Sequence, residues 1–129
     1  MKKTFIKIVT FILVAVMTCT MLASCGGPNA NPDKAVESLK KNDYVAEKID
    51  SKLGLLVFSW AGDGLECVVT GLDKDLEGVT IFYYESADAA NNAWEKVEEH
   101  ESDKDDDYVL KKSGKMIYVG TAEAIKAAK

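Results

Sequence analysis

The clearest strand and the clearest helix of the chain follow one another in VTIFYYESADAANNAWEKV, residues 79–97. Residues 79–84 are largely apolar on both alternations, which is typical of a central strand with two covered faces. Ser86 is a good N-cap for the helix that follows, and Asp88 places a negative charge in its first turn. The apolar face of this helix consists of Ala90, Trp94 and Val97. The stretch therefore predicts a strand followed by a helix that packs on its sheet.

The strand of this pair is predicted at residues 79–85. Four further strands are predicted before and after the pair, at residues 44–49, 66–70, 108–112 and 115–119. Residues 71–78 are rich in Asp and Gly and predict a loop between two of these strands. The last two strands predict a hairpin with a two-residue turn at Ser113-Gly114.

Two short helices are predicted near the ends of the mature chain. Asn31-Pro32-Asp33 offers a capping side chain, a proline suited to the first helical position and an acidic first turn. Asn42 is expected to end this helix in the left-handed conformation. Thr121 is expected to cap a final helix that runs to the end of the chain.

Residues 51–61 fit two structures. Leu53, Leu56, Val57 and Trp60 stand at the i, i+3, i+4 and i+7 positions of a helix. Asp50 or Ser51 can cap this helix, and Gly62 can end it. The alternative is a buried strand at residues 55–58, and the helix is favoured.

These elements predict an α+β fold with a single antiparallel sheet. Their order resembles the ferredoxin-like βαββαβ arrangement, with an added N-terminal helix, an extra hairpin strand and a short C-terminal helix. That arrangement implies two helices on one face of the sheet. The other face is expected to be either solvated or covered by the added terminal helices.

The N-terminus has the three zones of an export signal: Lys2 and Lys3, a largely apolar run, and small residues in Leu22-Ala23-Ser24 before Cys25. This ending resembles the lipobox of bacterial lipoproteins. The resemblance implies a diacylglycerol on Cys25 and cleavage after Ser24.

The expected organisation is therefore a signal peptide at 1–24, a lipidated cysteine and tether at 25–32, and a small α+β domain at 33–129. Two alternatives stay open: a retained transmembrane helix and ordinary secretion. A span needs about 20 apolar residues, whereas residues 8–23 offer only 16, three of them threonines. Gly26 after the cysteine is unlike the aspartate of inner-membrane retention. We therefore expect a lipid-anchored, extracytoplasmic protein on the cell membrane or the outer membrane.

Charge argues against two classes of partner. Removing the signal removes three of sixteen lysines and none of the 21 acidic residues, so the mature chain has a formal charge of −8 with His100 neutral. Such an acidic surface repels nucleic acid and anionic lipid headgroups. The only cysteine left beside Cys25 is Cys67, so no disulfide is expected within the monomer.

The candidates for chemistry are few. His100 is the only histidine, Cys67 is predicted to be a core residue, and Trp60 with Tyr83-Tyr84 is expected to pack in the core or, less favourably, to face a ligand. Residues Asp103–Asp107 resemble half of a calcium loop, but Tyr108 and Gly114 stand where that loop needs Gly and Glu. No catalytic residue, metal or cofactor is therefore predicted.

The sequence favours a non-enzymatic binding or interaction module for an envelope protein or a small ligand. The alternative is a structural or assembly accessory of an envelope complex. The fold class alone supports neither of the two.

Overall fold

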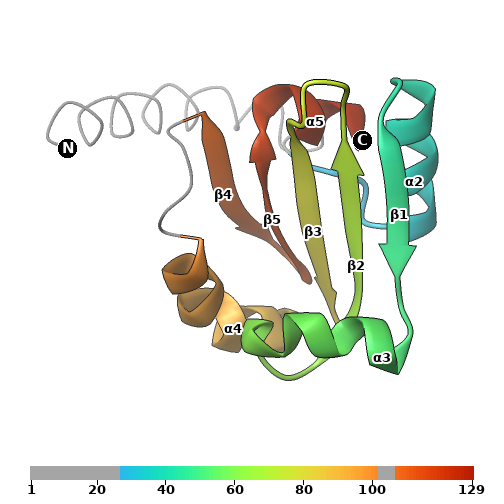
Figure 1. Cartoon of the computed structure of the whole chain (residues 1–129). Helices are drawn as coiled ribbons and strands as arrows, with labels where there is room; N and C mark the ends of the chain where they lie inside the picture. Colours follow the sequence, from blue (N-terminus) through green and yellow to red (C-terminus); the bar gives the residue numbers. More distant parts are fainter. Residues whose placement is uncertain (1–26, 102–106) are drawn as a thin grey trace, which may run out of the picture.

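The computed structural model describes residues 27–101 and 107–129, which fold around one five-stranded antiparallel sheet (Figure 1). The strand order is β1-β2-β3-β5-β4. The elements in chain order are α2 (Pro32–Lys41), β1 (Val45–Ile49), α3 (Lys52–Leu55), the 3₁₀ helix η2 (Leu56–Ala61), β2 (Leu65–Leu72), β3 (Gly78–Tyr84), α4 (Ala87–His100), β4 (Tyr108–Ser113), β5 (Met116–Thr121) and α5 (Ala122–Ala127). The α+β class expected from the sequence is confirmed.

The succession β1, α3–η2, β2, β3, α4, β4 has the expected βαββαβ order, and the extra hairpin strand β5 lies inside the sheet. Because β5 is antiparallel to both β3 and β4, those two strands are parallel to each other, with β5 between them. Helix α4 makes the crossover from β3 to β4. On the other side, β1, β2 and β3 are neighbours in chain order.

Helices cover both faces of the sheet. Helix α4 and the segment η2 pack on one face, while the two added terminal helices, α2 and α5, pack on the other. Side chains of β3 alternate between the two layers: Phe82 and Tyr84 point to the α4 side, and Ile81 and Tyr83 to the α2–α5 side, all of them buried. This double coverage explains why the strand is apolar on both alternations. The face of the sheet opposite α4 and η2, expected to be either solvated or covered, is thus covered by the terminal helices α2 and α5.

The loop between β2 and β3 is shorter than predicted. Gly71 and Gly78 both stay in the ladder, pairing with Val79 and Leu72 respectively, so the connection shrinks to residues 73–77. The Asp73 carboxylate closes it by accepting the backbone N–H groups of Asp75 and Glu77, at 2.8 and 3.0 Å. Gly78 serves the close approach of the two strands, and Gly71 serves the packing of Leu39 of α2 on the sheet.

Two turn assignments were wrong by one residue. Asn42 ends α2 with a φ of −100°, and the left-handed residue is Asp43 at +67°. In the second hairpin Ser113 still pairs with Met116, so the turn consists of Gly114 and Lys115. The positive φ of Gly114 (+58°) is the conformation that this tight turn needs.

The residues that precede α2 lie against the domain. The Asn29 N–H donates to the carbonyl oxygen of Ala128 (2.9 Å), and its side-chain amide donates to that of Lys129 (3.0 Å). The Tyr83 hydroxyl donates to the Asn29 carbonyl oxygen at 2.7 Å. Gly27 lies on the Tyr118 ring, where a Cβ would come within 3.0 Å of the hydroxyl oxygen. Much of the segment expected to be a tether, from residue 27 onward, is therefore docked beside α2 and α5.

Candidate functional site

The segment α3–η2 forms one end of the domain. Residues at its start and end explain where it begins and stops. Ser51 caps it, because its hydroxyl oxygen accepts the Gly54 N–H at 3.1 Å. Gly54 lets the helix pass close to β1, since a Cβ there would lie 2.6 Å from an Ile49 methyl carbon. Gly62 ends the segment with a φ of +94°. The helical interpretation of residues 51–61 is confirmed, and the strand alternative is wrong.

The inner side of this segment packs on the sheet. The residues on the α4 side of the core are Leu55, Phe58, Trp60 and Ala61, and the backbone is kinked at Phe58, whose φ of −106° and ψ of 21° are not helical. Phe58 and Trp60 both meet the Phe82 ring edge-on, with centroid distances of 5.9 and 5.6 Å. Phe58, Trp60 and Phe82, which we call the aromatic cluster, therefore hold the segment against the sheet.

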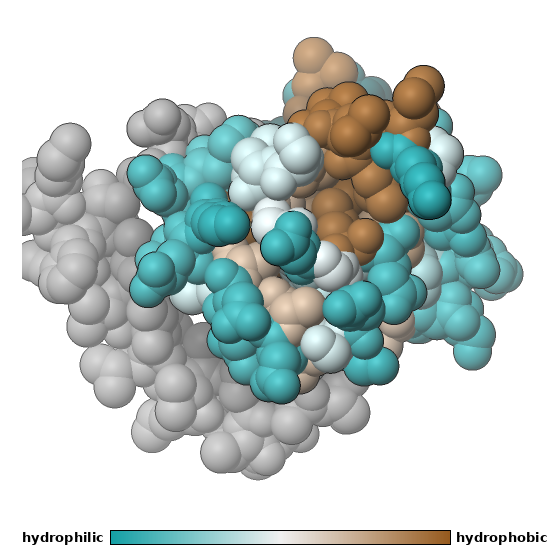
Figure 2. Space-filling model, turned by 90° about the horizontal axis from the view of Figure 1, so that it is seen from below, coloured by the Kyte–Doolittle hydropathy of each residue, from teal (hydrophilic) through white to brown (hydrophobic). Residues whose placement is uncertain are grey.

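The outer side of the same segment is also apolar. Leu53, Leu56 and Val57 have 81%, 66% and 71% of their surface exposed, and we call these three side chains the apolar patch. In Figure 2, which views this end of the domain, hydrophobic residues gather at the top right and are bordered by hydrophilic ones. Clustered exposed apolar side chains with a polar border mark interaction sites in soluble proteins. Three of the four residues in the helical spacing thus face solvent.

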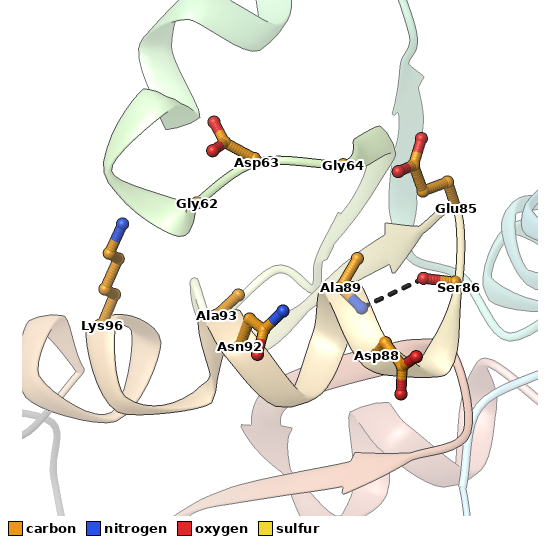
Figure 3. Close-up of a pocket in the computed structure, with 10 residues that line it drawn as sticks. All are labelled: Gly62, Asp63, Gly64, Glu85, Ser86, Asp88, Ala89, Asn92, Ala93 and Lys96. Carbon is orange, nitrogen blue, oxygen red and sulfur yellow. Dashed lines mark hydrogen bonds between the residues drawn. The ribbon is translucent and has the colours of Figure 1, made fainter.

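A polar hollow of about 290 Å³ adjoins the segment, between the turn at Gly62–Gly64 and the first turns of α4. The turn lies close to the helix because Gly62 and Gly64 face Ala93 and Ala89; a Cβ on Gly64 would come within 2.8 Å of the Ala89 Cβ. The end of α4 is already capped, since Ser86 Oγ accepts the Ala89 N–H at 3.1 Å (Figure 3).

The charged side chains around this hollow do not converge on a common point. Figure 3 shows the carboxylates of Asp63, Glu85 and Asp88 pointing apart, with Lys96 at the far side. Within residues 27–101 and 107–129, no group of three or more His, Cys, Asp or Glu side chains is arranged to hold a metal ion. The hollow is therefore an open, polar surface next to the apolar patch.

His100 lies at the end of α4, half-exposed. Its ring stacks on Trp60 with a centroid distance of 3.5 Å and an interplanar angle of 9°. Its Nδ1 lies 3.6 Å from Glu101 Oε1. This contact covers one face of the half-buried Trp60. His100 therefore extends the aromatic cluster to the surface.

The other residues singled out from the sequence lie in the core. Cys67 is buried beneath the α2–α5 layer, and burial raises the pKa of its thiol to about 11. Tyr83 and Tyr84 are buried too, and the Tyr84 hydroxyl donates to the Ala61 carbonyl oxygen at 2.8 Å. The core interpretation of these three residues is confirmed. The thiol stays protonated at neutral pH and is a poor nucleophile there.

Two predicted features lie outside the described residues. These are the lipobox with Cys25, and the acidic segment Asp103–Asp107 except for its last residue, which is exposed. The described residues contain no helix long and apolar enough to cross a membrane.

Comparison of the chain with protein-family models, with curated proteins and with solved structures finds no match. The case for function accordingly rests on the residues themselves.

Proposed function

We propose that this chain is a lipid-anchored protein of the bacterial cell envelope whose domain is a non-enzymatic binding module for a partner protein. The observation that carries the binding role is the apolar patch. Leu53, Leu56 and Val57 project from a capped helical segment that the aromatic cluster holds in place. The anchor is inferred from Leu22-Ala23-Ser24-Cys25.

The energetics of the patch suit protein recognition. Burying a large aliphatic side chain contributes about 1.5–3 kcal/mol, so three of them supply several kcal/mol to an interface. Residues that dominate an interface typically form a compact apolar centre with a polar surround. The polar hollow beside α4 provides such a surround on one side.

A second candidate is an assembly accessory that adds a strand of an envelope protein to the sheet edge. Strand β1 is one of the two edge strands, and its Val45 is 82% exposed. Leu72, which pairs with Val45, and Leu76 are also exposed. These three residues form a second exposed apolar group at the other end of the sheet. Glu47 and Lys48 in the short strand weigh against it, because charged residues on short edge strands discourage pairing.

The patch is tested by replacing Leu53, Leu56 and Val57 together with serine. We expect partner affinity to fall more than about a hundredfold, because roughly 3 kcal/mol or more of apolar burial is lost. Stability should stay nearly unchanged, since each substitution of an exposed side chain costs less than about 0.5 kcal/mol. The readout is crosslinking in intact cells followed by affinity purification of the lipidated protein and quantification of its adduct.

The matched control replaces the second exposed group, Val45, Leu72 and Leu76, with serine. The binding-module proposal expects this variant to keep the adduct. Loss of the adduct in the control alone would contradict the patch and favour strand addition at β1. A small molecule that co-purifies with the domain and survives the patch substitutions would contradict the protein-partner proposal.

The anchor is tested by Cys25→Ser. We expect an uncleaved, unlipidated precursor, because lipid-dependent cleavage loses its substrate when the thiol is absent. Metabolic labelling with a palmitate analogue, followed by gel mobility, measures both effects. Labelling of the serine variant at the level of the parent would show that the lipid is not on Cys25.

A further inference from the structure

The docked residues before α2 determine where the chain leaves the domain. Three hydrogen bonds join Asn29 to Ala128, Lys129 and Tyr83, and Gly27 lies on the Tyr118 ring. All of these contacts are on the side of the sheet that α2 and α5 cover. Figure 1 shows this start of the described chain running behind the strands, whereas α3 and α4 lie at the lower end.

Little chain separates this point from the proposed anchor. Cys25 precedes Gly27 by two residues, so their Cα atoms are at most about 8 Å apart. A lipid on Cys25, which is part of the proposed function, therefore brings the bilayer surface next to the α2–α5 side. The chain is too short for the domain to turn over freely.

The charges on the helices favour the same side of the domain as the tether does. The exposed lysines of α2, α5 and the two residues after each helix are Lys34, Lys40, Lys41, Lys126 and Lys129, against the four acidic residues Asp33, Glu37, Asp43 and Glu123. Two ion pairs use two of these acids and one of these lysines, Asp33 with Lys48 at 2.7 Å and Glu37 with Lys41 at 3.5 Å.

Helix α4, on the opposite face, has the reverse balance. It carries four acidic residues, among them Glu95, Glu98 and Glu99, against the single lysine Lys96. Anionic lipid headgroups attract lysines and repel carboxylates near the membrane surface, so they repel a mature chain of charge −8 as a whole and its α4 side most.

We propose that the domain lies on the anionic bilayer that holds its anchor, with the outer surfaces of α2 and α5 toward the headgroups. Helix α4 and the apolar patch then face away from that membrane. Tether length and charge, which are independent observations, give the same orientation. The patch is accordingly presented to a protein beyond the bilayer and does not insert into the lipid to which the chain is attached.

The test places one fluorescent probe on each side of the lipidated, full-length processed protein. Ala122→Cys labels α5 and Asn92→Cys labels α4, and both positions are exposed. Cys67 is buried and protonated at neutral pH, so it does not compete for the label. The protein is reconstituted in vesicles of phosphatidylcholine and phosphatidylglycerol (3:1, about 0.1 M salt, where screening acts over ~10 Å) that contain a lipid with a nitroxide headgroup.

We expect the α5 probe to be quenched several-fold more strongly than the α4 probe. Inserting about twenty Gly and Ser residues before Gly27 gives the tether a root-mean-square span of roughly 25 Å and should remove most of that difference. The variant Lys34→Glu with Lys126→Glu should reduce it without lengthening the tether.

Mass spectrometry of the purified protein shows whether Cys25 carries lipid, and so separates the proposed anchor from the proposed orientation. A lipidated protein whose two probes are quenched equally, or whose α4 probe is quenched more, would overturn the orientation and leave the anchor intact. A protein without lipid on Cys25 would overturn the anchor and, with it, this orientation.

Discussion

Gly78→Ala is expected to unfold the domain or to destabilise it by more than about 4 kcal/mol, a cost beyond that of most single substitutions. A Cβ on Gly78 would lie 1.8 Å from the carbonyl oxygen of Gly71 and 2.9 Å from its carbonyl carbon. Both atoms belong to the backbone of the neighbouring strand, so no side chain can turn aside to relieve the overlap. Chemical denaturation of the purified variant measures the loss.

Gly114→Ala is the matched control, because the same chemical change meets no steric obstacle there. No atom lies within 4 Å of a Cβ at Gly114, although its φ is +58°. The expected cost is about 1–2 kcal/mol, which is the penalty of a left-handed residue with a side chain. Equal losses for the two variants would show that close packing between β2 and β3 is not what requires Gly78.

Phe82→Ala is expected to cost about 3–5 kcal/mol, the range for removing a large aromatic side chain from a core. Phe82 is fully buried in the central strand, and the rings of Phe58 and Trp60 both rest against it. Its removal leaves a cavity under the segment that presents the apolar patch. The free energy of unfolding in urea gives the cost, and fluorescence in a Trp94→Phe background, where Trp60 is the only tryptophan, reports whether the segment has moved.

Leu76→Ala serves as the comparison for a large apolar residue that is 76% exposed. Its expected cost is within about 0.5 kcal/mol, as is usual for surface positions. Phe82→Leu should lie between the two because it keeps much of the volume. A loss under about 1 kcal/mol for Phe82→Ala would mean that the aromatic cluster does not support α3–η2.

Local signals in the sequence predicted most of the elements. Caps at Asn31, Ser51, Ser86 and Thr121 all form as expected, because a capping side chain acts on backbone groups only two or three residues away. The misplaced loop concerns two glycines. Gly71 and Gly78 resemble loop residues in sequence, yet they are selected by contacts with Leu39 of α2 and with the backbone of β2 respectively. Such contacts are not local in sequence, so composition alone misplaced the loop.

The candidate site was only half predictable. The spacing of Leu53, Leu56 and Val57 correctly indicated a helix, and an apolar stripe normally faces the core. Residues 56–61 instead form a 3₁₀ segment kinked at Phe58, with Phe58 and Ala61 toward the core, while Leu53, Leu56 and Val57 stay exposed. The signal available in the sequence was that this segment is apolar on every side, more than one buried face can use.

Two adjacent tyrosines make a mechanical connection through the sheet. Tyr83 reaches one face and holds Asn29, two residues after the docked Gly27, while Tyr84 reaches the other face and holds Ala61 at the end of η2. With the proposed anchor on Cys25, tension between the N-terminus and a load on the apolar patch is carried by the covalent chain through α2 and β1. The two tyrosine hydrogen bonds link both ends of that stretch to the central strand, which is bonded on both sides, to β2 and to β5. The ends of the loaded stretch are thus held by the best-supported strand of the sheet, while β1 between them is an edge strand.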